Sequence, residues 1–233
     1  LKLERFGRHT LQRPDPQAFW KPERPIETWA PDAIFNAKGD EDGGRWQETG
    51  HPLPEAWVMN WNSLRFEARC TAFRHMGVFP EHAVHWDWAQ RETARVRSRL
   101  RAKPSVLNLF GYTGLMSLAC AEAGADVTHL DASPKAIGYG RANQTLSGLD
   151  DASIRWICDD AIKFLRREVK RGRRYHGVIL DPPKHGRGPN GETWKLEEGY
   201  GELMALVRAV LDPEPAFVIA TVYAVRLSYL TLE

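Results

Sequence analysis

The fold of this chain is decided by the segment Val106-Leu-Asn-Leu-Phe-Gly-Tyr-Thr-Gly-Leu115. In this segment a short apolar run ends in a loop with Gly111 and Gly114, and an apolar helix pattern follows at once. This order predicts a buried strand, a tight turn and a helix. In open α/β sheets, ligands bind where parallel strands end and their connections begin. The segment therefore predicts a ligand crevice at the carboxyl end of a first parallel strand.

Two later apolar runs also end in polar residues. Val127-Thr-His-Leu-Asp131 ends in a carboxylate, and Gly177-Val-Ile-Leu-Asp181 leads into Pro182, Pro183 and Lys184. Because the carboxyl ends of parallel strands share one edge of a sheet, we expect all three strand ends to line the same crevice.

From Pro104 onward, strand and helix patterns alternate, which is typical of a parallel sheet with right-handed crossovers. Strands are expected at 106–109, 127–130, 154–158, 177–180 and 216–221. Helices are expected at 115–123, 134–146, 161–170 and 196–211. The predicted fold class is therefore α/β, with this core over residues 104–233.

Residues 1–60 are expected to form a small β-rich module that precedes the core. Prolines recur throughout this segment and exclude long helices. Trp20, Trp29, Trp46 and Trp57 are spread among short polar stretches. We expect these tryptophans to be mainly buried in the core of the module. The alternative is that some of them stack on nucleic-acid bases.

Residues 61–103 are expected to connect the module to the core. Apolar and polar residues alternate from Val58 to Arg69, which predicts strands, and residues 85–101 have the composition of a helix. This helix carries five arginines, namely Arg91, Arg95, Arg97, Arg99 and Arg101. They are expected to form a solvated helix face, and the alternative is a surface that contacts phosphates.

The composition excludes several classes of protein. With 42% hydrophobic and 27% charged residues, the chain is expected to be globular rather than disordered. The 32 basic and 30 acidic residues are too balanced to predict a nucleic-acid partner from charge alone. Cys70, Cys120 and Cys158 have no CxxC spacing, so neither a disulfide framework nor a metal site is expected. We expect a cytoplasmic protein without a secretion leader or a membrane span.

The first turn does not fit a dinucleotide. It has two glycines, whereas a Gly-x-Gly-x-x-Gly turn is needed to hold a pyrophosphate. S-adenosylmethionine carries an amino-acid tail in place of phosphates, so its turn needs close backbone approach and polar groups. Asp131 is placed to accept hydrogen bonds from both ribose hydroxyls, and Ile157-Cys-Asp-Asp-Ala161 brings a carboxylate toward an adenine amino group.

On these residues the chain resembles the class I S-adenosylmethionine-dependent methyltransferases. It more closely resembles the bacterial family that includes the 23S ribosomal RNA cytosine-C5 and guanine-N2 methyltransferases. The resemblance covers about residues 60–225 and rests on Asn108-Leu-Phe-Gly-Tyr-Thr-Gly114, Leu130-Asp-Ala-Ser133, Asp159-Asp-Ala-Ile-Lys-Phe-Leu165 and Leu180-Asp-Pro-Pro-Lys184. It implies a Rossmann-like methyltransferase core with a mainly parallel sheet, and a ribosomal RNA substrate. Such a fold usually has two more strands, so this core is expected to lack its last strands or to continue in a tail.

The resemblance also implies the site residues. Gly77-Val-Phe-Pro-Glu81 is similar to the segment that covers the cofactor in this family. The implied cofactor-binding residues are Phe79, Pro80, Asn108, Phe110, Gly111, Tyr112, Thr113, Gly114, Asp131, Ala132, Ser133, Asp159, Asp160, Ala161 and Asp181. The implied catalytic residues, which face the methyl group, are Asp181, Pro182, Pro183 and Lys184.

Simpler roles are also open for the acidic residues of this set. Asp131 could be only the N-cap of the helix that follows it, and Asp159 or Asp160 could cap the next helix. If one of that pair contacts adenine, Asp160 is preferred.

The acceptor is expected to be an exocyclic amine rather than cytosine C5. Asp181 and the Pro182 carbonyl can hold an amine so that its lone pair points at the methyl group. Cytosine C5 reacts only after a thiolate adds at C6. In the C5 methyltransferases of this resemblance that thiol follows the fourth or fifth strand, where this chain has Asp181-Pro-Pro-Lys-His185 and Ala220-Thr-Val-Tyr-Ala224. Cys70 and Cys120 have the surroundings of small core residues.

Several alternatives stay open at this point. The Gly-rich, basic segment 185–195 either closes over the substrate, with Trp194 stacked on a flipped base, or is an ordinary loop with Trp194 in the core. The core motifs report the cofactor and not the acceptor, so a protein or a small molecule is an alternative substrate. A further alternative is an RNA-binding module with an inactive core, although intact Asp131 and Asp181 argue against it. The sequence does not determine the target base or the oligomeric state.

Overall fold

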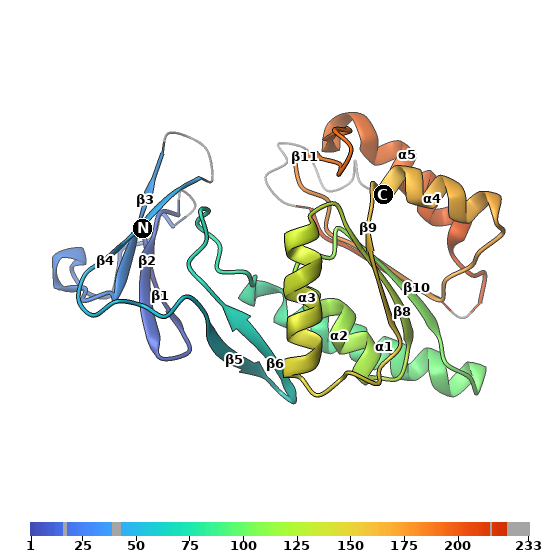
Figure 1. Cartoon of the computed structure of the whole chain (residues 1–233), viewed down its shortest axis with the longest axis horizontal. Helices are drawn as coiled ribbons and strands as arrows, with labels where there is room; N and C mark the ends of the chain where they lie inside the picture. The colour runs from blue at the N-terminus through green and yellow to red at the C-terminus, as the bar shows by residue number, and fades with distance from the viewer. Residues whose placement is uncertain (16–17, 39–42, 215, 223–233) are drawn as a thin grey trace. The chain divides into compact units, whose positions relative to one another are not determined.

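The structure is a computed structural model that describes residues 1–15, 18–38, 43–214 and 216–222 (Figure 1). The chain folds as two compact units, Leu1–Glu81 and His82–Glu233. The division between them lies inside the segment 61–103 that the sequence assigns to a connection. Within the described ranges, no helix has the length and apolar character needed to cross a membrane.

Unit 1 is built mainly from β-strands. Four strands form one sheet in the order β1-β2-β3-β4, and β5 pairs with β6 in an antiparallel hairpin. The elements are β1 (Lys2–Phe6), β2 (His9–Arg13), η1 (Ile26–Thr28), β3 (Ala33–Ala37), β4 (Gly44–Glu48), β5 (Trp57–Trp61) and β6 (Leu64–Ala68). The short helix η2 (Pro80–His82) begins in unit 1 and ends at the first residue of unit 2. The prediction of a β-rich N-terminal module is confirmed.

The expectation that the tryptophans of this module are mainly buried is wrong. Trp57 is buried, and its Nε1 donates a hydrogen bond to the Phe6 carbonyl at 3.0 Å. Trp29 and Trp46 are half-buried, and Trp20 is 60% exposed. A unit of this size has too little interior to enclose four indoles, and smaller apolar side chains occupy most of its core positions.

Unit 2 contains a five-stranded parallel sheet in the order β13-β10-β7-β8-β9. Its strands are β7 (Ser105–Leu109), β8 (Asp126–Asp131), β9 (Ile154–Cys158), β10 (Gly177–Leu180) and β13 (Phe217–Ala220). The chain starts at the central strand β7, moves outward to β9, and returns to the other side of β7 at β10. The connections therefore diverge between β7 and β10, which is where an open sheet binds its ligand.

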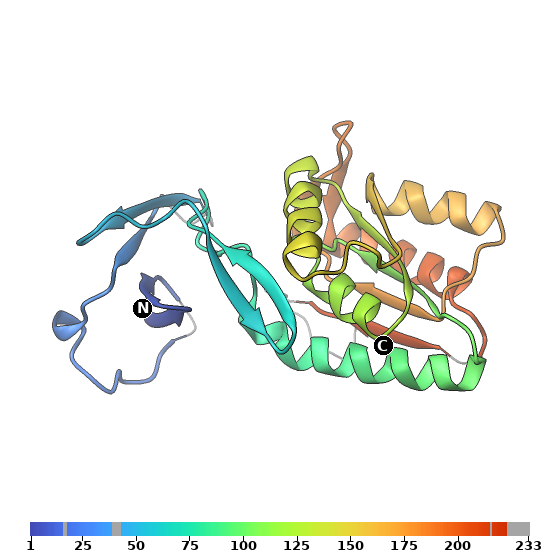
Figure 2. The same cartoon turned by 60° about the horizontal axis from the view of Figure 1, so that its bottom comes forward.

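Helices cover both faces of this sheet. They are α1 (Ala83–Leu100), α2 (Leu115–Glu122), α3 (Pro134–Leu146), α4 (Ala161–Lys170) and α5 (Leu196–Val210). Figure 2 shows α1, α2 and α3 (green to yellow) on one face, and α4 and α5 (gold and orange) on the other. Because both faces are covered, the central strands are largely buried: every residue of β10 is buried, and so is β7 from Val106 to Leu109. The predicted Rossmann-like core is confirmed, with elements close to their predicted bounds.

The segment 185–195 is an antiparallel hairpin of β11 (His185–Arg187) and β12 (Thr193–Lys195) rather than an irregular loop. Trp194 is only 7% exposed, and it packs with the hydrophobic core beneath α4 and α5. Its indole Nε1 donates to the Pro183 carbonyl at 2.7 Å. Of the two alternatives for Trp194, the core position is therefore correct, because a ring held in this way cannot stack on a flipped base.

Candidate cofactor and acceptor site

The predicted strand ends lie side by side at one edge of the sheet. Leu109 at the end of β7 is in register with Leu130 of β8 and with Leu180 of β10. Asp131 is in register with Cys158 at the end of β9. The residues that follow these four strands therefore meet at one edge, on both sides of the point where the connections diverge.

The turn after β7 has a backbone that few residues tolerate. Phe110 and Tyr112 have φ angles of 54° and 48°, and Gly114 has a φ of 85°. Positive φ is uncommon outside glycine, and such conformations are found preferentially at binding sites. The turn is closed by backbone hydrogen bonds of 3.0 Å from Gly111 N to Leu130 O and from Gly114 N to Gly111 O.

The two glycines of this turn are required by the rings that pack beneath it. A Cβ on Gly111 would lie 2.3 Å from Cε1 of His129, and a Cβ on Gly114 would lie 2.7 Å from the indole of Trp156. The His129 and Trp156 rings pack together with their centroids 4.4 Å apart. The turn therefore lies directly on an aromatic pair, and any side chain at these positions would lift it.

A chain of buried polar groups supports the turn from below. Asn108 Nδ2 donates to Ser117 Oγ at 2.9 Å, and Ser117 Oγ lies 2.9 Å from Nδ1 of His129. Burial lowers the pKa of His129 to about 3, so its ring is neutral at physiological pH. The Asn108 amide thus lies beneath the turn. Within the turn itself Thr113 is buried, and its carbonyl accepts a hydrogen bond from Asn143 Nδ2 at 3.0 Å.

Asp131 connects two strand exits through its carboxylate. Oδ2 accepts from Tyr112 N at 2.9 Å, and Oδ1 accepts from Ser133 N at 2.8 Å. Burial raises the pKa of Asp131 above its ordinary value, against the effect of the N–H groups of Ser133, Tyr112 and Ala132. The N-cap of α3 is Ser133, whose hydroxyl accepts from Ala136 N, so Asp131 is not that cap. The two carboxylate oxygens together offer about four lone pairs, so the group can accept a further hydrogen bond beside those from the backbone N–H groups.

Asp159 and Asp160 have different partners at the exit of β9. Asp160 is the N-cap of α4, since its Oδ1 accepts from Lys163 N at 2.9 Å. Asp159 accepts from Asp160 N at 2.8 Å and forms an ion pair with Arg167. Ala161, the first residue of α4, is buried. The capping alternative is therefore correct for Asp160, and the preference for Asp160 as the adenine contact stays a prediction.

The segment 181–184 is held from both sides. The Asp181 carboxylate accepts a hydrogen bond from the hydroxyl of Thr221, which follows β13. Pro182 is buried, and the Pro183 carbonyl accepts from Trp194 as described above. The Lys184 carbonyl accepts from Leu196 N at 2.9 Å, at the start of α5. These contacts fix the exit of β10 in one conformation.

Two histidines near Asp181 were not found from the sequence. His82 Nδ1 lies 4.0 Å from Asp181 Oδ2, and the His82 and His85 ring centroids are 5.4 Å apart. The available signal was their spacing of three residues at the start of a helix, which places both on one face. Nothing local links that helix end to the exit of β10, which lies much later in the chain. Thr221 was missed for the same reason.

Phe79 and Pro80 belong to unit 1, so their predicted contact with the cofactor stays a prediction. Phe79 packs against His75, with ring centroids 5.5 Å apart.

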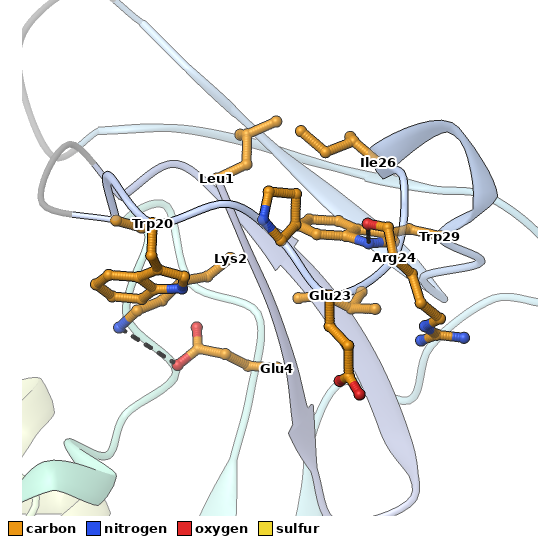
Figure 3. A pocket seen from close by; sticks show the side chains of 11 residues that line it. Leu1, Lys2, Glu4, Trp20, Glu23, Arg24, Ile26 and Trp29 are labelled. Atoms are coloured by element: carbon orange, nitrogen blue, oxygen red, sulfur yellow. Dashed lines mark hydrogen bonds and ion pairs between the residues drawn. The ribbon is translucent and has the colours of Figure 1, made fainter.

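Unit 1 has a cavity of about 530 Å³ of its own (Figure 3). Trp20 and Trp29 stand on opposite sides of it, and its charged lining residues are Lys2, Glu4, Glu23 and Arg24. Lys2 is paired with Asp15 at 2.9 Å and lies 4.0 Å from Glu4. The cavity lining therefore balances acid against base, so it shows no excess of positive charge for a nucleic-acid backbone. Base stacking in unit 1 stays a prediction.

A comparison with known protein families agrees with the α/β fold of unit 2 and with a ligand site at the ends of its strands. A sequence profile of the S-adenosylmethionine-dependent methyltransferases matches residues 34–220. The chain belongs to this family. The match confirms the predicted family, enzyme class and cofactor.

Individual relatives share part or most of the chain. A crystallised S-adenosylmethionine-dependent methyltransferase from Agrobacterium tumefaciens is 44% identical, with a TM-score of 0.92 over 99% of this chain and 72% of its own. The ribosomal RNA large subunit methyltransferase I of Shewanella denitrificans is 32% identical over 58% of this chain and 34% of its own length. The same enzyme from Aeromonas salmonicida is 30% identical over 53% of this chain and 31% of its own. The chain thus spans about a third of these ribosomal RNA enzymes.

Gly111→Ala should disturb the turn, because its new methyl group would meet the His129 ring. We expect a loss of about 1–3 kcal/mol in the free energy of unfolding, the usual range for overpacking, together with weaker binding of S-adenosylmethionine. Denaturant unfolding and calorimetric titration measure the two effects. Gly138→Ala is the matched control, because a Cβ there meets nothing within 4 Å. A Gly111→Ala protein that matches this control would show that the turn does not need its glycine.

Asp131→Ala should weaken the binding of S-adenosylmethionine by about 1–3 kcal/mol, the scale of hydrogen bonds to a charged group. The variant loses the predicted ribose acceptor and the anchor of Tyr112 N. Isothermal titration calorimetry measures the change. Asp126→Ala, at the opposite end of β8, should leave the affinity unchanged. Equal affinities of the two variants would remove Asp131 from the cofactor site.

Proposed function

We propose that this protein transfers the methyl group of S-adenosylmethionine to an exocyclic amine of a base in ribosomal RNA. The observation that carries the proposal is the meeting of two anchored carboxylates at one sheet edge. Asp131 is held by the turn after β7 and by the exit of β8, and Asp181 is held by Thr221 at the point where the connections diverge. In this proposal Asp131 binds the cofactor, and Asp181 holds the acceptor of the methyl group.

In this proposal the cofactor lies across the ends of β10, β7, β8 and β9. Asp131 uses its remaining lone pairs for the two ribose hydroxyls, with Ala132 and Ser133 beside the ribose. The turn at 110–114 approaches the methionine part, supported from below by Asn108. Asp159, Asp160 and Ala161 border the adenine. The methyl group then faces the segment 181–184.

The proposed RNA substrate is supported by the relatives. The two relatives from Shewanella denitrificans and Aeromonas salmonicida are both named ribosomal RNA large subunit methyltransferase I, and the similarity of each covers more than half of this chain. The sequence motifs of unit 2 indicate the cofactor rather than the methyl acceptor. The proposal that the substrate is ribosomal RNA therefore rests on these relatives. A ribosomal substrate would place the protein in the cytoplasm.

The cysteines support an amine rather than cytosine C5 as the acceptor. Burial raises the pKa of Cys120 to about 12 and that of Cys70 to about 11, so both thiols are protonated at neutral pH. Cys158 is exposed, but it ends β9, three strands away from β10. At the usual spacing between strands this is about 14 Å, too far to attack a base held at Asp181. Burial, Asp131 and Asp159 also raise the pKa of Cys158.

Asp181 suits the task of holding an amine. Methyl transfer is an in-line displacement, so the protein contributes mainly by placing the nucleophile. The Asp181 carboxylate can accept an N–H of the amine, which turns the nitrogen lone pair toward the methyl group. Thr221 and the buried Pro182 fix that carboxylate, and Trp194 fixes the Pro183 carbonyl beside it.

The proposal is tested with purified protein, S-adenosylmethionine labelled in its methyl group, and fractions of total RNA, total protein and small metabolites. We expect the label in RNA, sensitive to nuclease and resistant to protease. Asp181→Ala should slow the transfer on the order of 10²-fold, the lower range for a group that acts on the reacting atoms, with nearly unchanged cofactor affinity. Label in the protein or metabolite fraction would favour those acceptors instead. Tight cofactor binding without any transfer would favour an inactive RNA-binding module.

The choice of atom has its own test. Cys70→Ala, Cys120→Ala and Cys158→Ala should each keep the transfer rate within a few-fold, and RNA with 5-fluorocytosine should form no covalent complex. The physical reason is that an amine needs no thiolate to become nucleophilic. A trapped complex, or a folded cysteine variant without activity, would show that the acceptor is a ring carbon.

A further inference from the structure

The Asp181 carboxylate has a different neighbour on each oxygen. Oδ1 accepts from the Thr221 hydroxyl, and Oδ2 faces Nδ1 of His82 at 4.0 Å. His82 is the N-cap residue of α1, a helix that precedes the sheet in the chain. The fold thus brings an imidazole from the start of unit 2 to the carboxylate proposed to hold the acceptor.

The surroundings of His82 distinguish it from its neighbour His85. Both rings lie on one face of α1, and the Asp181 carboxylate lies near His82 and acts on the pKa of His85. Burial and the neighbouring His82 lower the pKa of His85, although Asp181 acts in the opposite direction. Nδ1 of His85 is buried and has no hydrogen-bond partner among the described residues. His85 therefore packs as a neutral ring, whereas the side chain of His82 is 21% exposed and reaches solvent.

Amine methylation leaves a proton to be removed. When the nitrogen attacks the methyl carbon, the bond from that carbon to sulfur breaks, and the cofactor leaves as a neutral thioether. The nitrogen then carries four bonds and a positive charge, and it must lose one proton to become the neutral methylated amine. Imidazole is the side chain best suited to exchange a proton near neutral pH.

We propose that His82 receives, by way of Asp181, the proton that the methylated amine loses. The Asp181 carboxylate accepts the proton from the positively charged nitrogen and passes it to Nδ1 of His82. The imidazolium that forms is paired with the regenerated carboxylate and then releases its proton to solvent. This inference rests on the proposed function, because it requires an amine acceptor at Asp181.

The present distance is compatible with such a relay. A separation of 4.0 Å is longer than a hydrogen bond, but hydrogen bonds of catalytic groups are often long before the substrate binds, and one water can bridge them. A base seated on Asp181 would exclude solvent from the carboxylate, which is only 28% exposed. The route through His82 then leads from the covered acceptor to open water.

The test compares His82→Ala and His82→Gln with the wild-type protein in single-turnover methyl transfer to RNA. Glutamine can still donate a hydrogen bond to Asp181 but cannot take up a proton. We expect both variants to be slower on the order of 10²-fold, with cofactor affinity within about twofold of wild type. Free imidazole should restore much of the rate of His82→Ala and leave His82→Gln and the wild type unchanged. His51→Ala, an exposed histidine of unit 1, should keep the wild-type rate with and without imidazole.

The outcomes separate this inference from the proposed function. If the wild-type protein labels RNA and either His82 variant keeps the wild-type rate, the relay is overturned and the proposed function stands. A slow His82→Ala variant that imidazole does not rescue would also overturn the relay, since a proton acceptor in solution should replace the ring that this variant lacks. If the wild-type protein binds the cofactor and labels no RNA, the proposed function fails, and the relay fails with it. Unchanged cofactor affinity shows that a slow variant is folded.

Discussion

The candidate site at the edge of the parallel sheet depends on one carboxylate, which accepts backbone hydrogen bonds from two turns. Asp131 accepts the N–H of Tyr112 from one strand exit and the N–H of Ser133 from the next. Tyr112 has a positive φ, which is unfavourable for its residue type, and a hydrogen bond to a charged acceptor helps to hold it there. The geometry of the first turn is therefore stabilised from the neighbouring strand and not by the turn alone.

A second link joins the cofactor side of the edge to the acceptor side. Trp194 donates to the Pro183 carbonyl, and its ring packs near Phe110 with centroids 5.4 Å apart. One buried indole thus contacts both the turn after β7 and the segment after β10. The hairpin that carries Trp194 is a structural part of the site, and a change in its packing would reach both carboxylates.

Much of the fold and of the candidate site could be predicted because the signals are local. An apolar run that ends in Asp131 or Asp181 marks a strand and its exit within a few residues, whatever the rest of the chain does. The contacts of His82 and Thr221 with Asp181 depend on tertiary packing between distant elements, which no short pattern reports. The exposure of Trp20 could not be predicted for a similar reason, since it depends on the size of unit 1 and not on the residues that adjoin Trp20 in the sequence.

The buried His129 ring beneath the first turn makes the stability of the folded protein depend on pH. His129 is buried and neutral, with a pKa of about 3, whereas an unfolded chain would protonate the same ring near pH 6.5. Between these two values the unfolded chain binds the additional proton, so this residue favours unfolding increasingly as the pH falls from about 6.5 toward 3. Acidification would thus act on the cofactor turn from within, through the ring on which it lies.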